Sequence, residues 1–222
     1  MKKSRPKLNA GKIKTFSKMR LLITAGGTRE YIDPVRFITN ASSGKIGYAL
    51  ARAAQKAGHK VTLISASDLQ PPVGVDFVGV DTAAEMFVAV KKHFPGCDCL
   101  IMAAAVADYT PVKQAKFKIK KTEKSLTIKL KPTADILKWA GKNKKKNQIV
   151  VGFALEDRAI RTRAEKKLKE KNLDMIIANT PAAIGADKSM VQMKTSGSPW
   201  SKIENATKIY TAKRIICLIQ NL

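Results

Sequence analysis

Acidic residues are scarce in this sequence: 17 Asp and Glu stand against 42 Lys and Arg among 222 residues, a formal net charge of +25. Histidine and cysteine are also scarce, with two and three copies. Three cysteines cannot build a disulfide framework, and Cys97 and Cys99 form C-x-C instead of the C-x₂-C pairing of zinc sites. The cysteines are therefore predicted to be small apolar filler in a reducing, cytoplasmic setting.

Long apolar runs are missing as well. No stretch approaches the roughly 18–20 residues that a membrane span needs. The basic N-terminus has no apolar segment of the kind that a secretory signal contains, and no linker or internal repeat divides the rest. The sequence, 45% apolar, predicts one globular domain over 19–222, a basic disordered extension over 1–18, and no association with membranes.

The positive charge is concentrated in a few places along the chain. Four segments carry +23 of the net +25: 1–18, 113–131, 142–146 and 158–171. Such clusters fit non-specific contact with nucleic acid, neutralisation of small polyanionic substrates, or, for the tail and 142–146, plain solvated surface.

Apolar patterning predicts strands that alternate with helices. Short apolar runs typical of buried strands cover 19–25, 61–65, 75–80, 98–105, 148–154 and 173–179. Helical spacing predicts three helices: 44–58 with Gly58 as its cap, the stretch from the capping box of Thr82 and Glu85 to His93, and 156–171. This order predicts an α/β, Rossmann-like three-layer fold with a mostly parallel sheet, plus a small antiparallel flap or hairpin.

Polar residues follow several predicted strands, at the end where parallel sheets bind ligands. After the first strand, Gly26-Gly27 lacks the G-x-G-x-x-G spacing of nicotinamide enzymes, and no G-x₄-G-K-[ST] P-loop is present. What remains is Ser42-Ser43-Gly44 at a helix start. Amide N–H groups and the helix dipole favour an anion there, although plain N-capping by the serines is an open alternative.

A series of motifs resembles phosphopantothenoylcysteine synthetase, the ligase half of the bacterial bifunctional coenzyme A biosynthesis protein: ITAGGTREYIDPVRFITNASSGKIGYALA, AAAVADY, KIKK, LTIKL, VVGFALE and KNLDMIIANT. The resemblance is collinear from about Met19 to Asn179, and its most specific stretch is D-P-V-R-F-I-T-N-x-S-S-G-K-x-G at 33–47. After residue 180 the resemblance thins, and a closing hairpin and helix are expected.

The resemblance implies a two-step reaction. A nucleoside triphosphate, CTP or ATP, activates the carboxylate of 4'-phosphopantothenate as an acyl-nucleotide and releases pyrophosphate. The amine of cysteine then attacks, which gives 4'-phosphopantothenoylcysteine and a nucleoside monophosphate. The resemblance also implies Mg²⁺ and a homodimer. Since only the basic tail precedes Met19, a separate flavin-dependent decarboxylase is expected to act downstream.

The resemblance assigns roles to three residues around the reacting carboxyl group. Asn40 is expected to hydrogen-bond the carboxyl or the acyl-nucleotide. Arg36 is expected to clamp phosphate or carboxylate, with a structural salt bridge to Glu30 or Asp33 as the alternative. Lys118 matches the active-site lysine and is expected to stabilise charge at the reacting phosphorus.

The resemblance also implies a set of nucleotide-contacting positions: Ser42, Ser43, Gly44, Met102, Ala103, Ala104, Asp108, Lys118, Ala134, Asp135, Ile136, Leu137, Phe153, Lys167 and Lys171. Asp108 is in addition a candidate for contact with the metal ion. Lys167 and Lys171 are four residues apart and share one helical face, for which a solvated face is the ordinary alternative.

Two other functions are alternatives to the ligase. An NAD(P)-dependent Rossmann-fold reductase is disfavoured by the missing glycine fingerprint and the missing Tyr-x-x-x-Lys dyad. A basic nucleic-acid-binding protein is disfavoured because the basic clusters lack interleaved aromatic residues, so no specific nucleic-acid partner is expected. The charged, aperiodic segment 110–125 fits either a mobile lid or a surface loop.

Overall fold

The computed structural model describes residues 17–222, so residues 1–16 of the predicted extension lie outside the described part. Eight strands of this part form the main sheet, in the order β12-β11-β10-β9-β6-β1-β4-β5. Two further sheets have two strands each, β2 with β3 and β7 with β8. In chain order the helices and strands are β1 (Arg20–Ala25), β2 (Arg29–Tyr31), β3 (Phe37–Thr39), α1 (Lys45–Lys56), β4 (Lys60–Ser65), β5 (Asp76–Gly79), α2 (Ala83–His93), β6 (Cys99–Met102), β7 (Tyr109–Pro111), β8 (Leu130–Pro132), α3 (Ile136–Asn143), β9 (Ile149–Leu155), α4 (Ile160–Glu170), β10 (Met175–Asn179), β11 (Lys188–Thr195), β12 (Ser201–Thr207) and α5 (Lys208–Ile219).

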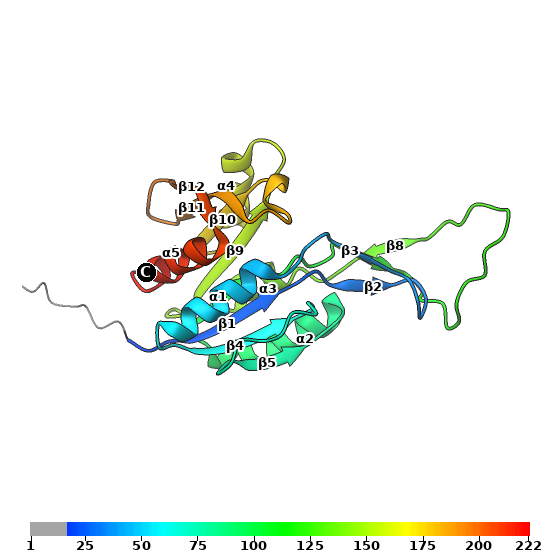
Figure 1. The fold of residues 1–222 in the computed structure, drawn as a ribbon, viewed down its shortest axis with the longest axis horizontal. Coiled ribbons are helices and arrows are strands. Elements are labelled where there is room, and N and C mark those ends of the chain that lie inside the picture. The colour runs from blue at the N-terminus through cyan, green and yellow to red at the C-terminus, as the bar shows by residue number, and fades with distance from the viewer. Residues whose placement is uncertain (1–16) are drawn as a thin grey trace, which may run out of the picture.

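Helices cover both faces of the main sheet and give the molecule three layers (Figure 1). Along β1, Leu21 and Ile23 join the core under α1 and α5, whereas Leu22 joins the core under α2, α3 and α4. Because successive side chains alternate between the faces, a strand covered on both sides must be apolar throughout. The predicted three-layer α/β fold is confirmed. Within residues 17–222, no helix is both long and apolar enough to cross a membrane.

The main sheet is parallel through its centre and antiparallel at one edge. From β5 to β10 neighbouring strands run parallel, and β11 and β12 then form an antiparallel hairpin that α5 follows. This confirms the mostly parallel sheet and the closing hairpin and helix. The strand order reverses between β1 and β6, so the carboxyl ends of these two neighbours mark the switch point at which such sheets bind ligands.

Short-range signals in the sequence explain how α1 and α2 are placed. A Cβ on Gly47 would lie 2.5 Å from the Cβ of Ala25, so glycine lets α1 approach β1 closely. Gly58 follows α1 with a φ of +87°, as predicted for a C-terminal cap. Thr82 and Glu85 form the predicted capping box at the start of α2.

One predicted strand is shorter than its apolar pattern. The strand expected over 98–105 ends at Met102. Beyond it, Ala105 forms an isolated bridge with Gly27 and donates its N–H to the carbonyl oxygen of Gly26 at 2.8 Å. The alanines therefore leave regular pairing with β9 and close over the end of β1, which places irregular backbone at the switch point.

The helix predicted near 156–171 also begins later than expected. It starts at Ile160, and the preceding Ala159 has a left-handed φ of +48°. A left-handed residue cannot continue a right-handed helix, so 156–159 form a bend between β9 and α4.

The two small sheets form an arm that projects from the body of the molecule (Figure 1). The arm consists of residues 29–39, which contain β2 and β3, and residues 109–132, which contain β7, β8 and the long loop between them. Both pairs are antiparallel, which confirms the predicted antiparallel flap.

His59 links the first strand to the last helix. Its Nδ1 accepts the N–H of Met19 at 3.1 Å, and its Nε2 lies 3.0 Å from the side-chain amide of Gln220. Burial lowers the pKa of His59 below its ordinary value of 6.5, because desolvation disfavours the imidazolium ion.

The neutral His59 therefore predicts a pH dependence of stability. Its contribution is fully present above pH 6.5, and it declines as the pH falls from there through the lower folded-state pKa, because the unfolded chain takes up the proton first. Urea unfolding between pH 5 and pH 8 should show this loss, and His59→Gln should flatten it. An equally steep profile for His59→Gln would contradict this assignment.

Candidate active site

The carboxyl ends of β1 and β6 bring the first glycine turn against the strand-end alanines. The backbone N–H of Ala104 donates to Oγ1 of Thr24 at 3.2 Å, and that of Thr28 donates to the carbonyl oxygen of Ala105 at 3.3 Å. Met102 is buried, whereas Ala103 and Ala104 are partly exposed. Small, partly exposed residues thus follow β6 at the place where the sequence predicts that a ligand approaches the backbone.

Asn40 lies at this switch point. Its Nδ2 donates to the carbonyl oxygens of Ala105 and Val106, at 3.2 Å and 3.1 Å. The two hydrogens of the amide are thus engaged, and Oδ1 remains as an exposed acceptor. Asn40 therefore connects the end of β3 to the loop after β6 and presents a neutral polar group to the surface.

The turn Ser42-Ser43-Gly44 leads directly into α1. Gly44 is the N-cap residue with a φ of +74°, no side chain caps the helix, and its first turn contains no acid. The structure therefore contradicts the alternative that a serine caps α1. The N–H groups of the first turn carry the positive end of the helix dipole, which suits an anion.

A second group of predicted residues meets on the other side of the switch point, at the ends of β9 and α3. The Nζ of Lys167 donates to the carbonyl oxygen of Phe153 at 2.8 Å, and the Nζ of Lys171 lies 2.8 Å from Oδ2 of Asp135. The two lysines thus point to one place, which argues against the solvated-face alternative. Asp135 also accepts the N–H of Lys138 and so caps α3.

The electrostatics of this group fit an anionic ligand. Burial lowers the pKa of Lys167, and the positive charge of Lys171 lowers it further. Burial alone would raise the pKa of Asp135, but hydrogen bonds from Lys171 and from the Lys138 backbone outweigh it and lower the pKa. A largely buried lysine with a close cationic neighbour gains from a nearby phosphate, which compensates both charges.

The remaining predicted nucleotide positions surround these lysines. Asp108 is exposed and close enough to Lys167 to act on its pKa electrostatically. Ala134 is exposed, whereas the side chains of Ile136 and Leu137 are buried in the core. At those two positions only the backbone of the first turn of α3 is available to a ligand. No cluster of three metal-binding side chains occurs among residues 17–222.

Lys118 lies elsewhere, in the exposed loop of the arm. Its neighbour Ile119 donates its N–H to Oδ2 of Asp33 at 3.1 Å and accepts Nη2 of Arg36 at 2.7 Å. Lys118 is thus held near Arg36 at the outer end of β3. Arg36 and Asn40 are four positions apart in extended chain, a distance of roughly 13 Å.

Arg36 forms the salt bridge to Asp33 that the sequence left open, and Glu30 instead accepts the N–H of Ala83 at 2.9 Å. The carboxylate of Asp33 is fully buried, and the hydrogen bond from Arg36 is the largest cause that holds its pKa well below the usual range. This pair holds the long loop at Ile119, while the guanidinium remains partly exposed.

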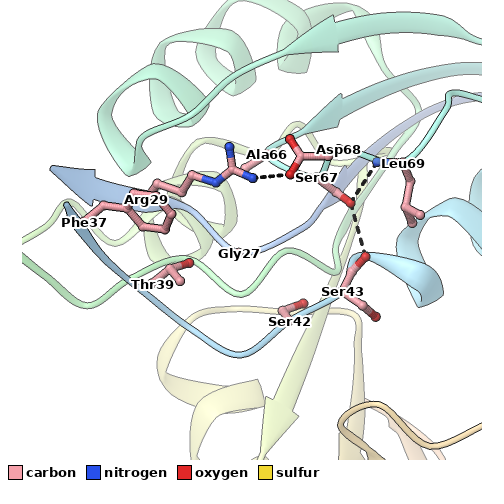
Figure 2. Close-up of a pocket in the computed structure, with 10 residues that line it drawn as sticks. All are labelled: Gly27, Arg29, Phe37, Thr39, Ser42, Ser43, Ala66, Ser67, Asp68 and Leu69. Carbon is pink, nitrogen blue, oxygen red and sulfur yellow. Dashed lines mark hydrogen bonds and ion pairs between the residues drawn. The ribbon is translucent and has the colours of Figure 1, made fainter. Parts of the chain in front are cut away.

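A cavity of about 370 Å³ lies beside the Ser-Ser-Gly turn, on the side of β4 (Figure 2). Sequence reasoning missed part of its lining: Arg29, Phe37, Ala66, Ser67, Asp68 and Leu69. The polar stretch after the predicted strand 61–65 was the available signal, because it too follows a strand at its carboxyl end.

Comparison with known proteins identifies a family that this chain matches. Residues 16–222 match the model of the DNA/pantothenate metabolism flavoprotein C-terminal domain. A solved structure, the C-terminal domain of the coenzyme A biosynthesis bifunctional protein CoaBC, superposes with a TM-score of 0.81 at 40% identity, over 93% of this chain and 96% of that chain.

Two curated relatives are longer than this chain. The coenzyme A biosynthesis bifunctional protein CoaBC of Bacillus subtilis is 51% identical over 168 residues, which cover 75% of this chain and 41% of the relative. A cysteine/cysteine sulfinic acid decarboxylase from an unknown prokaryotic organism is 43% identical over 215 residues, or 94% of this chain and 60% of the relative. The chain therefore spans about half the length of these relatives.

Proposed function

The chain belongs to the family of DNA/pantothenate metabolism flavoprotein C-terminal domains, and from this membership we propose that it is a ligase of coenzyme A biosynthesis. In this proposal it joins 4'-phosphopantothenate to L-cysteine through an acyl-nucleotide, with CTP or ATP as co-substrate. The resemblance seen in the sequence is confirmed at the level of the family by the CoaBC relative and the CoaBC domain structure.

One observation carries the proposal: two groups suited to anions lie on either side of the switch point that holds Asn40. These groups are the uncapped first turn of α1 and the paired lysines Lys167 and Lys171. A nucleotide and a carboxylate that must react repel each other in water. A site that compensates both charges can hold them in reacting geometry.

The chemistry requires this arrangement because a carboxylate resists nucleophiles. Its oxygen attacks the α-phosphorus of the nucleotide, pyrophosphate leaves, and the mixed anhydride then offers a nucleoside monophosphate as a good leaving group. Lys167, Lys171 and the amides of α1 bind phosphate oxygens, and Lys118 stabilises charge at the reacting phosphorus. Attack by the amine forms the amide and releases the monophosphate.

In this proposal Asp108, an exposed carboxylate near Lys167, would hold Mg²⁺. Mg²⁺ commonly takes one or two carboxylates and completes its shell with phosphates and water, so a single aspartate beside the phosphate-binding lysines fits this ion. Bound Mg²⁺ supplies charge neutralisation on the phosphates.

A turnover assay with 4'-phosphopantothenate, cysteine and each of the four nucleoside triphosphates tests the proposal. We expect pyrophosphate and nucleoside monophosphate in equal amounts with CTP or ATP, and no CO₂ from cysteine. Nucleoside diphosphate as the product, or no turnover with either nucleotide, would contradict it. Release of CO₂ from cysteine alone would favour the chemistry in the name of the decarboxylase relative.

We propose further that two copies of the chain pair through their arms. The arm exposes large apolar side chains, among them Val35 at 58%, Phe117 at 75% and Leu126 at 58%. Large apolar side chains exposed on one projecting arm are typical of protein interfaces, and a symmetric dimer covers them with the same surface of the second copy. Pairing of the arms would bring Lys118 of one copy to the switch point of the other.

Mixing two inactive variants tests the pairing. If Lys118 acts on the other copy, a mixed dimer of Asn40→Asp and Lys118→Gln contains one intact site, so an equal mixture should recover roughly a quarter of wild-type turnover by random pairing. Sedimentation should give twice the chain mass of 24.3 kDa. No recovery in a verified mixed dimer would place Lys118 in its own chain's site, and a monomer would exclude the pairing.

A further inference from the structure

Two of the four basic segments of the sequence have no part in the proposed reaction, namely 1–18 and 142–146. The fold brings their described residues to one edge of the main sheet. Lys18 lies just before β1, and 142–146 lead into β9. Because β1, β6 and β9 run parallel, their amino ends share one edge. β1 begins at the end of the molecule away from the arm (Figure 1), opposite the carboxyl ends that hold Asn40 and the paired lysines.

Two contacts join these regions of the chain across the edge. Arg20, two positions after Lys18, donates its Nη2 to Oδ1 of Asp98 at 2.7 Å. The Nζ of Lys145 donates to the carbonyl oxygen of Pro95 at 3.1 Å. Asp98 and Pro95 belong to the same turn between α2 and β6, so the start of β1 and the chain before β9 meet at this turn.

A cavity of about 600 Å³ opens at the same edge, and we name it the amino-end cavity. Lys60 at the start of β4 and Lys92 in the last turn of α2 line it together with Arg20. Leu22 and Val78 form its apolar floor. Alternate residues of a strand face one side of the sheet, so Arg20 and Leu22 both point to the side of α2. The cavity therefore collects basic groups from three separate elements.

Six exposed lysines lie along this edge, and we name them the amino-edge band: Lys18, Lys60, Lys92, Lys142, Lys145 and Lys146. Acidic groups offset only part of the charge at this edge. The carboxylate of Asp98 neutralises Arg20, and that of Asp174, 2.7 Å from its Nζ, neutralises Lys144. Asp76 faces Lys60 at the longer distance of 3.8 Å. The band therefore keeps a positive excess.

Helix dipoles account for only part of the band. In a parallel α/β fold the carboxyl ends of the helices lie at this edge, and a basic side chain in the last turn stabilises a helix. Lys92 in α2 and Lys142 in α3 have this position. The other four lysines flank strands or lie in the loop before β9, beyond the last helical turn, where the effect of the dipole falls off. Their charge is therefore available for a partner.

The charges of the band form a row and do not converge on one point. β4, β1, β6 and β9 are neighbours in the sheet, and strands lie roughly 4.8 Å apart, so the row from Lys60 to Lys145 spans about 14 Å. One small anion cannot reach both ends of such a row, whereas a linear polyanion can follow it. A nucleic-acid strand carries a phosphate about every 3.4 Å of helix axis, so roughly four phosphates match this length.

The side chains at the edge favour nucleic acid over a lipid surface. Segments that bind membranes peripherally insert apolar side chains beside their basic ones. Among residues 17–222, none of the large apolar side chains that are exposed belongs to 17–22, 91–98 or 142–148. The edge therefore offers charge without an apolar anchor, which is what contact with a phosphate backbone requires.

We propose that the amino-edge band binds the phosphate backbone of nucleic acid, without preference for sequence, on the side of the molecule opposite the proposed active site. Lysine side chains bind phosphates as point charges, and no contact with a base is needed. Residues 1–16, which precede this edge in the chain, add six basic residues and no acid. The inference goes beyond the proposed ligase and does not depend on it.

A band variant tests this interface by combining Lys142→Gln, Lys145→Gln and Lys146→Gln. The probe is a fluorescein-labelled thymidine oligonucleotide of about 20 nucleotides, long enough to cover a single-strand site. Each lost phosphate contact lowers the slope of log K against log salt by roughly 0.7. Fluorescence anisotropy between about 50 and 200 mM KCl should show a slope smaller by about 2, with binding weaker by roughly 10- to 100-fold at about 100 mM.

The matched control replaces three exposed lysines outside the band, on β11, β12 and α5: Lys188→Gln, Lys202→Gln and Lys213→Gln. It changes the net charge equally and should bind within about threefold of the wild type, because salt screens exposed charges beyond about 10 Å. Lys60→Gln with Lys92→Gln removes the other end of the row and should lower the slope by about 1.4. An unchanged thermal unfolding midpoint shows that each variant is folded.

Three results would overturn the inference. Equal weakening in the band variant and the control would show that only the net charge matters. A wild-type protein that does not bind the oligonucleotide at about 50 mM salt would exclude the interface. Tighter binding to phosphatidylglycerol vesicles, lost in the band variant, would identify a lipid surface as the partner. None of these measurements involves turnover, so their outcome is separate from that of the ligase assay.

Discussion

Lys118→Gln is expected to slow acyl-nucleotide formation by about 10²–10³-fold, the usual effect of removing one group that stabilises transition-state charge. Glutamine keeps most of the side-chain length and loses the positive charge. Lys118 is exposed, and no ion pair of it is found within residues 17–222, so the role proposed for it is electrostatic and depends on the substrate. Rapid-quench measurement of a single turnover without cysteine reports this step directly.

Lys121→Gln is the matched control, an exposed lysine of the same loop. It is expected to react at a rate within about twofold of the wild type, because an exposed charge outside the site is screened by salt. Neither substitution should move the thermal unfolding midpoint. Equal losses in the two variants would show that the loop acts through its total charge and that Lys118 has no special position.

Asn40→Asp is expected to lower overall turnover by about 10³-fold or more. The substitution removes both N–H donors from the carbonyl oxygens of Ala105 and Val106, and it adds a negative charge where a carboxylate and phosphates must gather. Steady-state formation of the amide with all three substrates present measures the loss.

Asn143→Asp provides the control for Asn40→Asp. Asn143 also donates its Nδ2 to a backbone carbonyl, that of Trp139 at 2.8 Å, but it lies at the end of α3 outside the site. Its turnover should stay near the wild-type value. If Asn40→Asp retained more than a tenth of the activity, Asn40 would be a structural link between β3 and the loop after β6, and the assignment of the reacting centre would be wrong.

Apolar patterning was sufficient for most of the fold. Continuous apolar runs such as that of β1 are buried on both faces, so the sequence pattern and the burial coincide. The apolar pattern predicted too long a strand at 98–105, where tertiary contacts determine the path of the backbone. Ala103 to Ala105 are as apolar as a strand, but regular pairing ends before them and the backbone of Ala105 pairs with the glycine turn. No local signal predicts this.

Some contacts of the candidate site follow from the sequence and others do not, because sequence spacing gives only local neighbours. Helical spacing placed Lys167 and Lys171 on one face, and the structure confirms that they converge. Spacing along the chain cannot reveal the partner of Arg36, because Asp33 and Glu30 are both near in sequence and only the tight turn before β3 selects Asp33.

The ion pair that lines the cavity beside the Ser-Ser-Gly turn could not be predicted either, because its two residues are far apart in the sequence. Arg29 and Asp68 lie 39 residues apart, on the arm and after β4. They meet only because β1 and β4 are neighbours in the sheet. A long-range pair of this kind depends on strand order, which a single sequence does not encode locally.

The central claim is that the carboxylate of 4'-phosphopantothenate attacks the α-phosphorus of a nucleotide. Labelling both carboxylate oxygens with ¹⁸O tests it most directly, because the amine displaces the bridging oxygen together with the phosphate. Mass spectrometry should find one ¹⁸O in the nucleoside monophosphate after turnover with cysteine. Label in inorganic phosphate, with the nucleoside diphosphate as product, would show attack at the γ-phosphorus and contradict the account.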